Sequence, residues 1–172
     1  MWRSGSAHRA AVIGAAAAFG LALALTGCGN AAENAAENVI EAENPGTDVE
    51  LDGDGVKVTD EEGNTSEFGT GADLPDGWPT VVPVPDGDVT FASKSGEDFT
   101  AGVTLDGSSQ DAYEAWKSDL EGAGFTEEDT ANIGGNYLGT FTGNGYDVGY
   151  TISSDPSSDG KTAVILNVTP AS

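Results

Sequence analysis

The sequence predicts an α+β fold of two layers, in which one amphipathic helix packs on an antiparallel sheet of about five strands. Only residues 108–124 place apolar side chains at helical spacing. After residue 88, several short runs alternate between apolar and polar residues, with the period of a half-buried strand. Turn sequences such as Gly143-Asn144-Gly145 separate these runs and favour hairpins. An acidic β-hairpin or meander is expected on the N-terminal side of this layer pair.

Residues 1–27 have the organisation of a secretory signal. Residues 1–9 carry two arginines, residues 10–25 are apolar without interruption, and residues 25–28 read Leu-Thr-Gly-Cys. The apolar run is too short for a bilayer span, which needs about 20 residues. The segment resembles a bacterial lipoprotein signal with its lipobox. The resemblance implies palmitate-type lipidation of Cys28 and an anchor in the cell membrane, on the extracytoplasmic face.

The composition after residue 27 excludes several kinds of chemistry. Both arginines and the single histidine lie in residues 1–9, so the remainder holds four lysines against 29 acidic residues. A chain without histidine cannot build a Ser-His-Asp or Cys-His nucleophile, nor the usual zinc or copper ligand sets. The negative charge repels the phosphates of nucleic acid. We therefore expect no catalytic residues, no cofactor and no nucleic-acid partner.

Residues 28–46 are rich in alanine and glutamate and contain two Asn-Ala-Ala-Glu units, with almost no apolar face. A helix there would lack the packing from which most helical stability comes. We expect an acidic flexible tether that ends at Pro45-Gly46 and has an r.m.s. reach of about 23 Å.

Residues 47–71 alternate weakly and contain Asp-Gly and Glu-Gly-Asn turn sequences, which predicts a small polar β-meander. The stretch has too few apolar residues for a core of its own, so it either pairs with the following sheet or is mobile. Asp48, Glu50 and Asp52 match the first ligand positions of a calcium loop. The last ligand position, normally glutamate, is Thr59, and an acidic hairpin with Asp-Gly turns explains the pattern better.

Residues 72–172 are expected to form the globular domain, and they begin with a proline-rich segment. Four prolines between residues 74 and 87 exclude a helix and disfavour a central strand, while Trp78 and several valines interleave with them. Such a segment is either a polyproline ligand for a partner or a strap that covers the edge of the core. The interleaved apolar residues favour the strap.

The rest of this domain supplies the predicted sheet and helix. Strands are expected at 89–94, 99–105, 137–141, 146–152 and 163–168, with a weaker one at 125–130. Ser108 is expected to start the helix as its N-cap, and Gly124 to end it. The expected structural core residues are Trp78, Phe91, Phe99, Tyr113, Trp116, Leu120 and Phe125.

Two motifs carry a further resemblance. Residues 74–85 read Leu-Pro-x-x-Trp-Pro-x-x-Val-Pro-x-Pro, and residues 113–125 read Tyr-x-x-Trp-x-x-x-Leu-x-x-x-Gly-Phe. With the lipobox and the acidic tether, these motifs resemble a group of uncharacterised actinobacterial-type lipoproteins. The resemblance covers about 100 residues, and it implies a fold rather than an activity.

The function expected from these observations is that of a non-enzymatic binding domain, tethered outside the cell membrane, for a protein or a glycan of the cell envelope. Its contact surface is expected on the sheet face away from the helix, where threonines gather. These threonines are Thr90, Thr100, Thr104, Thr140, Thr142 and Thr151. The alternatives are a divalent-cation (calcium) binding domain and, more remotely, a glycan hydrolase with two carboxylates.

Replacement of Cys28 by serine is expected to abolish lipidation, because the Cys28 thiol is the lipid acceptor that the signal implies. The Cys28→Ser chain should accumulate as an uncleaved precursor and incorporate no labelled palmitate, whereas the wild type incorporates it. Equal incorporation into the two chains would contradict the lipobox interpretation.

Overall fold

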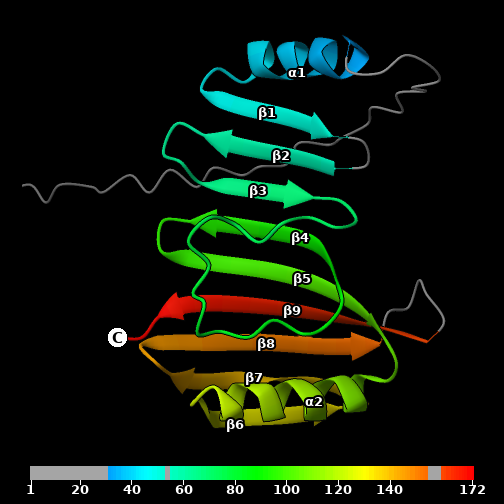
Figure 1. Ribbon diagram of the computed structural model, residues 1–172, viewed down its shortest axis with the longest axis vertical. Coiled ribbons are helices and arrows are strands. Elements are labelled where there is room, and N and C mark those ends of the chain that lie inside the picture. The colour runs from blue at the N-terminus through cyan, green and yellow to red at the C-terminus, as the bar shows by residue number, and fades with distance from the viewer. Residues whose placement is uncertain (1–30, 53–54, 155–159) are drawn as a thin grey trace, which may run out of the picture.

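A computed structural model describes residues 31–52, 55–154 and 160–172 (Figure 1). Side chains are described from residue 37 on, apart from that of Asp52. Cys28 and the signal residues 1–27 lie outside the described ranges. Within those ranges, no helix is both long enough and apolar enough to cross a membrane.

A single antiparallel sheet of nine strands forms the body of the molecule (Figure 1). The strands are β1 (Thr47–Asp52), β2 (Gly55–Asp60), β3 (Thr65–Phe68), β4 (Asp88–Ser95), β5 (Asp98–Asp106), β6 (Thr126–Ile133), β7 (Asn136–Gly143), β8 (Tyr146–Ser154) and β9 (Lys161–Pro170). Their order across the sheet is β1-β2-β3-β4-β5-β9-β8-β7-β6. Helix α1 (Ala31–Glu43) packs on β1, and helix α2 (Ser109–Gly122) packs on β6 to β9.

The predicted two-layer α+β fold with about five strands is wrong. The described part of the chain is close to all-β, since it consists mostly of one nine-stranded sheet with two short helices. The hydrogen-bonded ladder between β3 and β4 runs from the pair Thr65–Lys94 to the pair Phe68–Phe91, so β1 to β3 continue the main sheet. Strands at the margins of a sheet are held by backbone hydrogen bonds and need no buried face. A prediction from apolar alternation therefore misses strands of this kind, because their alternation is weak.

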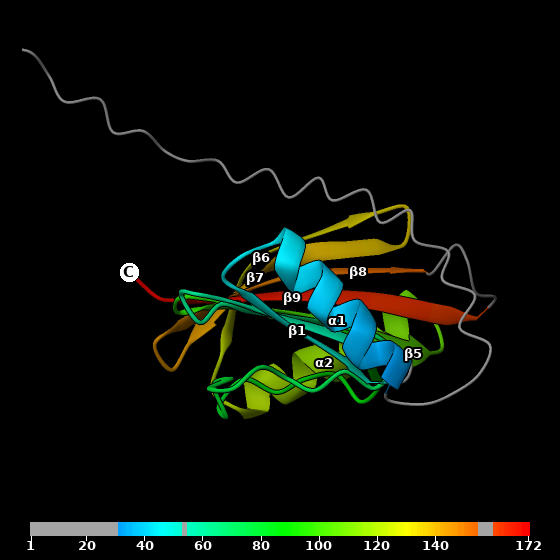
Figure 2. The same ribbon diagram turned by 90° about the horizontal axis from the view of Figure 1, so that it is seen from above.

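Helix α2 and the segment 69–87 together cover one face of the sheet (Figures 1 and 2). The ring of Trp116, which is 1% exposed, packs edge-on against Phe141 and Tyr150. Its indole Nε1 donates a 3.0 Å hydrogen bond to the carbonyl of Pro83, which ties the helix to the segment. The core lies between these two covering elements and strands β5, β9, β8 and β7.

The limits of α2 follow from its capping residues. At the N-terminus, Ser108 accepts a hydrogen bond from the backbone N–H of Asp111. At the C-terminus, Gly124 adopts a φ of 90°, and the N–H of Phe125 donates to the carbonyl of Leu120 at 2.9 Å. This turn directs Phe125 into the core.

The proline-rich segment crosses the core as a cover. Val82 is 3% exposed, and Trp78 packs edge-on against Phe99 with their ring centroids 5.9 Å apart. The Nε1 of Trp78 donates a 3.3 Å hydrogen bond to the carbonyl of Val82, which closes the segment on itself. Its apolar side chains are therefore used against the sheet.

Phe91 lies on the opposite face from the other expected core residues. Phe99, Trp116, Leu120 and Phe125 are buried, and Trp78 and Tyr113 pack against them partly buried. A bulge shifts the register of β4 between Val89 and Phe91, so Val89 and Ala92 face the core while Phe91 faces away from it. A bulge adds one residue to the alternation, and the sequence pattern does not show it.

Helix α1 occupies part of the region expected to be a flexible tether. Glu41 accepts a 3.1 Å hydrogen bond from the N–H of Val49, and Glu37 accepts a 2.7 Å hydrogen bond from the N–H of Leu51. These N–H groups point outward from β1, the first strand of the sheet, and an uncovered edge would leave them unpaired. The edge of β1 thus supplies the helix with a packing partner that its own sequence does not reveal.

Replacement of Trp116 by alanine is expected to lower the free energy of unfolding by about 3–5 kcal/mol, because it removes a buried ring and leaves a cavity. Urea denaturation followed by circular dichroism measures the change. Trp116→Phe keeps a ring and loses the hydrogen bond to Pro83, so its loss should be smaller. A change below about 0.5 kcal/mol in Trp116→Ala, typical of surface positions, would contradict this packing.

Candidate functional site

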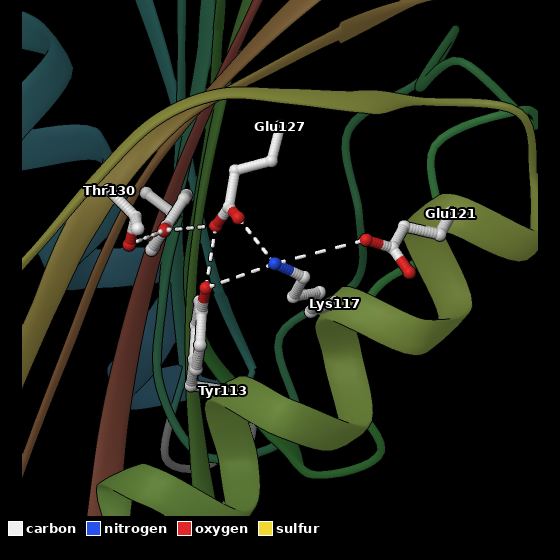
Figure 3. Close-up of polar contacts among 6 residues, drawn as sticks. Tyr113, Lys117, Glu121, Glu127 and Thr130 are labelled. Atoms are coloured by element: carbon white, nitrogen blue, oxygen red, sulfur yellow. Dashed lines mark hydrogen bonds and ion pairs between the residues drawn. The ribbon is translucent and has the colours of Figure 1, made fainter.

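Polar side chains gather between α2 and β6, on the covered face of the sheet (Figure 3). The carboxylate of Glu127 accepts a 2.6 Å hydrogen bond from the hydroxyl of Tyr113 and forms a charge-assisted hydrogen bond with Lys117. The Tyr150 hydroxyl lies 3.3 Å from the same carboxylate and 2.7 Å from the hydroxyl of Thr130. These five residues, which we call the polar cluster, bring together α2, β6 and β8.

The pKa values in the polar cluster are displaced away from neutrality. The hydrogen bond to Glu127 raises the pKa of Lys117. Burial raises the pKa of Glu127, but the hydrogen bonds from Lys117 and Tyr113 outweigh burial and lower it. Burial raises the pKa of the Tyr150 hydroxyl. A general acid or base works best with a pKa near the operating pH, so these shifts are the reverse of those that proton transfer requires.

The polar cluster therefore acts as a clamp between the helix and the sheet. Glu127 joins β6 to two residues one turn apart on α2, Tyr113 and Lys117. The Tyr113 ring stacks on Tyr137 of β7 with centroids 4.5 Å apart, and Lys117 has a second acidic neighbour, Glu121, at 3.8 Å. The contacts with Glu127 and Tyr137 position α2 on the last two strands of the sheet, whereas the contact with Glu121 lies within the helix.

Replacement of Glu127 by glutamine is expected to lower the free energy of unfolding by about 1–3 kcal/mol, because two hydrogen bonds lose their charged acceptor. The pKa of Glu127 is lowered on folding, so its contribution is present above pH 4.5, the ordinary carboxyl value, and is lost as the pH falls further. The difference in melting temperature between the wild type and Glu127→Gln should therefore narrow in acid.

The matched control for this change is Glu128→Gln, on the next, exposed residue of the same strand. It should leave the melting temperature nearly unchanged at neutral pH. A destabilisation of Glu127→Gln that stays constant down to strongly acidic pH would contradict the clamp.

The calcium-loop candidates do not converge in the described part of the chain. Asp48 and Glu50 lie on the extended strand β1, where alternate residues are about 6.8 Å apart. Glu50 lies 3.8 Å from the Nζ of Lys57 on β2. The side chain of Asp52 lies outside the described residues. Among the described residues, no group of three His, Cys, Asp or Glu side chains is placed to hold a metal ion.

The second candidate surface is the face of the sheet opposite α2, which we call the uncovered face. Beyond β1, where α1 packs, no helix or loop of the described residues covers it (Figures 1 and 2). All six threonines singled out from the sequence lie on this face, as the strand registers show. Thr90, at the bulge, is assigned to this face by its contact with Gly102, which lies on the same face. The Oγ1 of Thr90 is 3.7 Å from the point where a Cβ on Gly102 would lie.

An apolar row crosses the uncovered face from one edge of the sheet to the other. Directly paired residues of neighbouring strands share a face, and one continuous line of pairs is almost wholly apolar. From β1 to β6 in sheet order, the apolar row is Leu51, Val56, Phe68, Phe91, Gly102, Ile165, Thr151, Leu138 and Ala131. Phe68, Ile165 and Leu138 are 50%, 48% and 39% exposed, so the row presents large apolar side chains to solvent along one line.

A second row, two residues along each strand, is rich in hydroxyl groups. This hydroxyl row is Val49, Val58, Ser66, Ser93, Thr100, Asn167, Gly149, Thr140 and Asp129. The two rows form a band about 7 Å wide, whose single ionisable side chain is Asp129 on the last strand. Acids border the band on both sides.

These bordering acids lie on the same face as the band. Asp60, Asp98 and Asp147 lie beyond the hydroxyl row, each two residues from one of its members. Asp88 and Asp106 lie on the other side, beyond the apolar row, and Lys161 forms an ion pair of 3.1 Å with Asp106 there. In a chain with 29 acidic residues, the band is thus a strip with one acid, Asp129, at its β6 end, inside an acidic surface.

The exposed apolar residues of the band were not predicted from the sequence. Ile165 stands between the core residues Val164 and Leu166, and Leu138 follows Tyr137, so both are out of phase with the core alternation of their strands. An apolar residue out of phase with the core alternation is the sequence signal that could have indicated an exposed apolar surface. Phe68 and Phe91 required knowledge of the pairing between β3 and β4.

Comparisons with known proteins return no match, whether to a protein-family model, to a curated protein or to a solved structure. The function is therefore inferred from the fold and from the two surfaces described above.

Proposed function

We propose that this chain is a membrane lipoprotein, anchored by Cys28 on the extracytoplasmic face, whose domain binds a component of the cell envelope through the uncovered face and catalyses no reaction. The observation that carries the proposal is the band across all nine strands, in which Asp129 is the single ionisable side chain. The anchor is supported by the sequence of residues 1–28, and the binding surface by the geometry of the sheet.

The band differs from an ordinary solvated sheet face. An antiparallel sheet commonly turns a polar face to water, and this chain has 29 acidic residues with which to build one. It places apolar side chains at the centre of the face and acids at its borders instead. Binding surfaces have this arrangement, with a centre depleted of charge and a polar rim. Contiguous exposed apolar surface on a soluble domain also indicates an interaction site.

The polar cluster supports a role without catalysis. Its carboxylate, ammonium and hydroxyl groups satisfy one another, and their pKa shifts favour the protonation states that they already hold at neutral pH. The strongest polar contacts on the covered face are thus used to hold α2 in place. The uncovered face remains as the surface where a ligand meets exposed side chains.

A single charge at the centre of the band is expected to abolish binding. In Ile165→Asp, contact with the ligand would bury an unpaired carboxylate, so binding of the full chain in detergent to isolated cell walls should fall by at least about tenfold. Co-sedimentation measures this binding. Ile165 is 48% exposed, so the melting temperature should change little.

The matched control is Val81→Asp, which introduces the same charge at another exposed apolar residue, on the segment that covers the opposite face. It should bind cell walls like the wild type. Equal binding by wild type, Ile165→Asp and Val81→Asp would mean that the uncovered face is not the binding surface.

A further inference from the structure

We infer that the ligand of the uncovered face is a neutral polysaccharide chain. The inference rests on the proposed function and adds the chemical class of the ligand.

Charge is the first argument. A polyanion, such as a phosphate-containing envelope polymer, would meet the aspartates on both borders of the band. A polycation would find no counter-charge along the band itself, apart from Asp129 on the last strand. A ligand that fills the band therefore gains most when it carries no charge, because no charged group then loses its hydration on binding.

The surface chemistry of the two rows is the second argument. The rings of Phe68 and Phe91 lie side by side with centroids 4.8 Å apart, and they present aromatic surface next to the bare backbone of Gly102. A Cβ on Gly102 would lie 3.4 Å from the Cβ of Phe91, so the glycine leaves room beside the ring. Farther along the row, Ile165 continues the apolar surface.

The hydroxyl row runs parallel to this apolar surface, about 7 Å away. Thr100 and Asn167, neighbours on β5 and β9, already share a hydrogen bond of 3.3 Å across the row. Hydroxyl and amide groups both donate and accept hydrogen bonds. A sugar ring has a face rich in C–H groups and hydroxyls at its edges. When that face lies on the apolar row, the hydroxyls reach toward the hydroxyl row.

A hollow of about 690 Å³ beside β1 to β3 is not part of the band. Lys57 and Glu67, which line its polar side, are paired in register with each other, and Glu67 is paired with the core residue Ala92. Both side chains therefore lie on the covered face, beside the segment 69–87.

Charge also disfavours a second copy of the chain as the occupant. Stacking two uncovered faces would bring the five bordering aspartates of one copy against those of the other, and like charges at an interface oppose association. A basic protein would satisfy the borders, but its binding would weaken strongly with salt. The salt dependence of binding therefore separates a glycan from a basic protein.

Isothermal titration calorimetry of the full chain in detergent tests the inference, with soluble dextran, arabinogalactan and mixed-linkage β-glucan as probes. At least one of these neutral polysaccharides should bind, with an affinity that changes less than about twofold up to about 0.5 M NaCl. Phe68→Ala should lower the affinity at least about tenfold, because the exposed ring supplies aromatic surface to the band, and Phe68→Leu should lower it less. Val81→Ala should leave it unchanged.

Lys57→Met and Lys94→Met remove lysines of the covered face, and Lys94 is held against the covering segment by the carbonyl of Asp76. Both variants should leave the affinity unchanged, since the inferred ligand lies on the other face of the sheet.

The possible failures can be told apart. Absence of binding to all three probes, while Ile165→Asp still loses its cell-wall binding, overturns the polysaccharide inference and leaves the proposed function standing. Cell-wall binding that disappears with salt overturns the inference in favour of a basic protein. Polysaccharide binding that is unaffected by Phe68→Ala overturns the location. Unchanged cell-wall binding by Ile165→Asp overturns the proposed function itself.

Discussion

The insertion of β9 between β5 and β8 is the constraint on which the rest of the structure depends. In the sheet order, strands β1 to β5 meet strands β8 to β6 only through this last strand. Its buried residues Val164, Leu166 and Val168 face α2 and the proline-rich segment, whereas Ile165, between them, faces the other side. One strand thus supplies the centre of the core and the centre of the apolar row. Because it is the last strand of the chain, neither surface is complete until the C-terminal residues have paired.

Local signals explain which parts of the fold could be predicted from the sequence. The capping residues and apolar stripe of α2, and the hairpin with Gly143-Asn144-Gly145, are encoded within short windows and were found. Helix α1, the joining of β1–β3 to the sheet and the bulge at Thr90 depend on contacts with distant backbone. The N–H groups of β1 that bind Glu37 and Glu41 cannot be seen in the composition of the helix. An α+β interpretation followed, since strands without a buried face were not counted as part of the sheet.

The candidate surfaces, like the fold, were predictable from the sequence only where the signal is local. The uncovered face was predicted from its threonines, because alternation alone places them opposite the core. Its apolar row could not be predicted, since Phe68, Phe91, Ile165 and Leu138 become neighbours along one line only through the registers of distant strands. The polar cluster could not be predicted without the tertiary structure either. Lys117 and Glu127 are close in sequence, but Tyr150 reaches the same carboxylate from β8. Charge patterns predict that acids and lysines pair, and tertiary structure decides which of them do.

For the proposed anchor at Cys28, the position of helix α1 also has a consequence for how the domain stands relative to the membrane. The helix begins three residues after Cys28, and three residues span at most about 10 Å, so a lipid on Cys28 would lie within about 10 Å of the start of the helix. Nine strands spaced about 4.8 Å apart place β6 roughly 40 Å from β1. The number of strands in the sheet then sets the distance between the β1 end of the band, near the anchor, and its β6 end. Lengthening residues 28–30 would loosen the base of the molecule, whereas deleting a hairpin would shorten its reach.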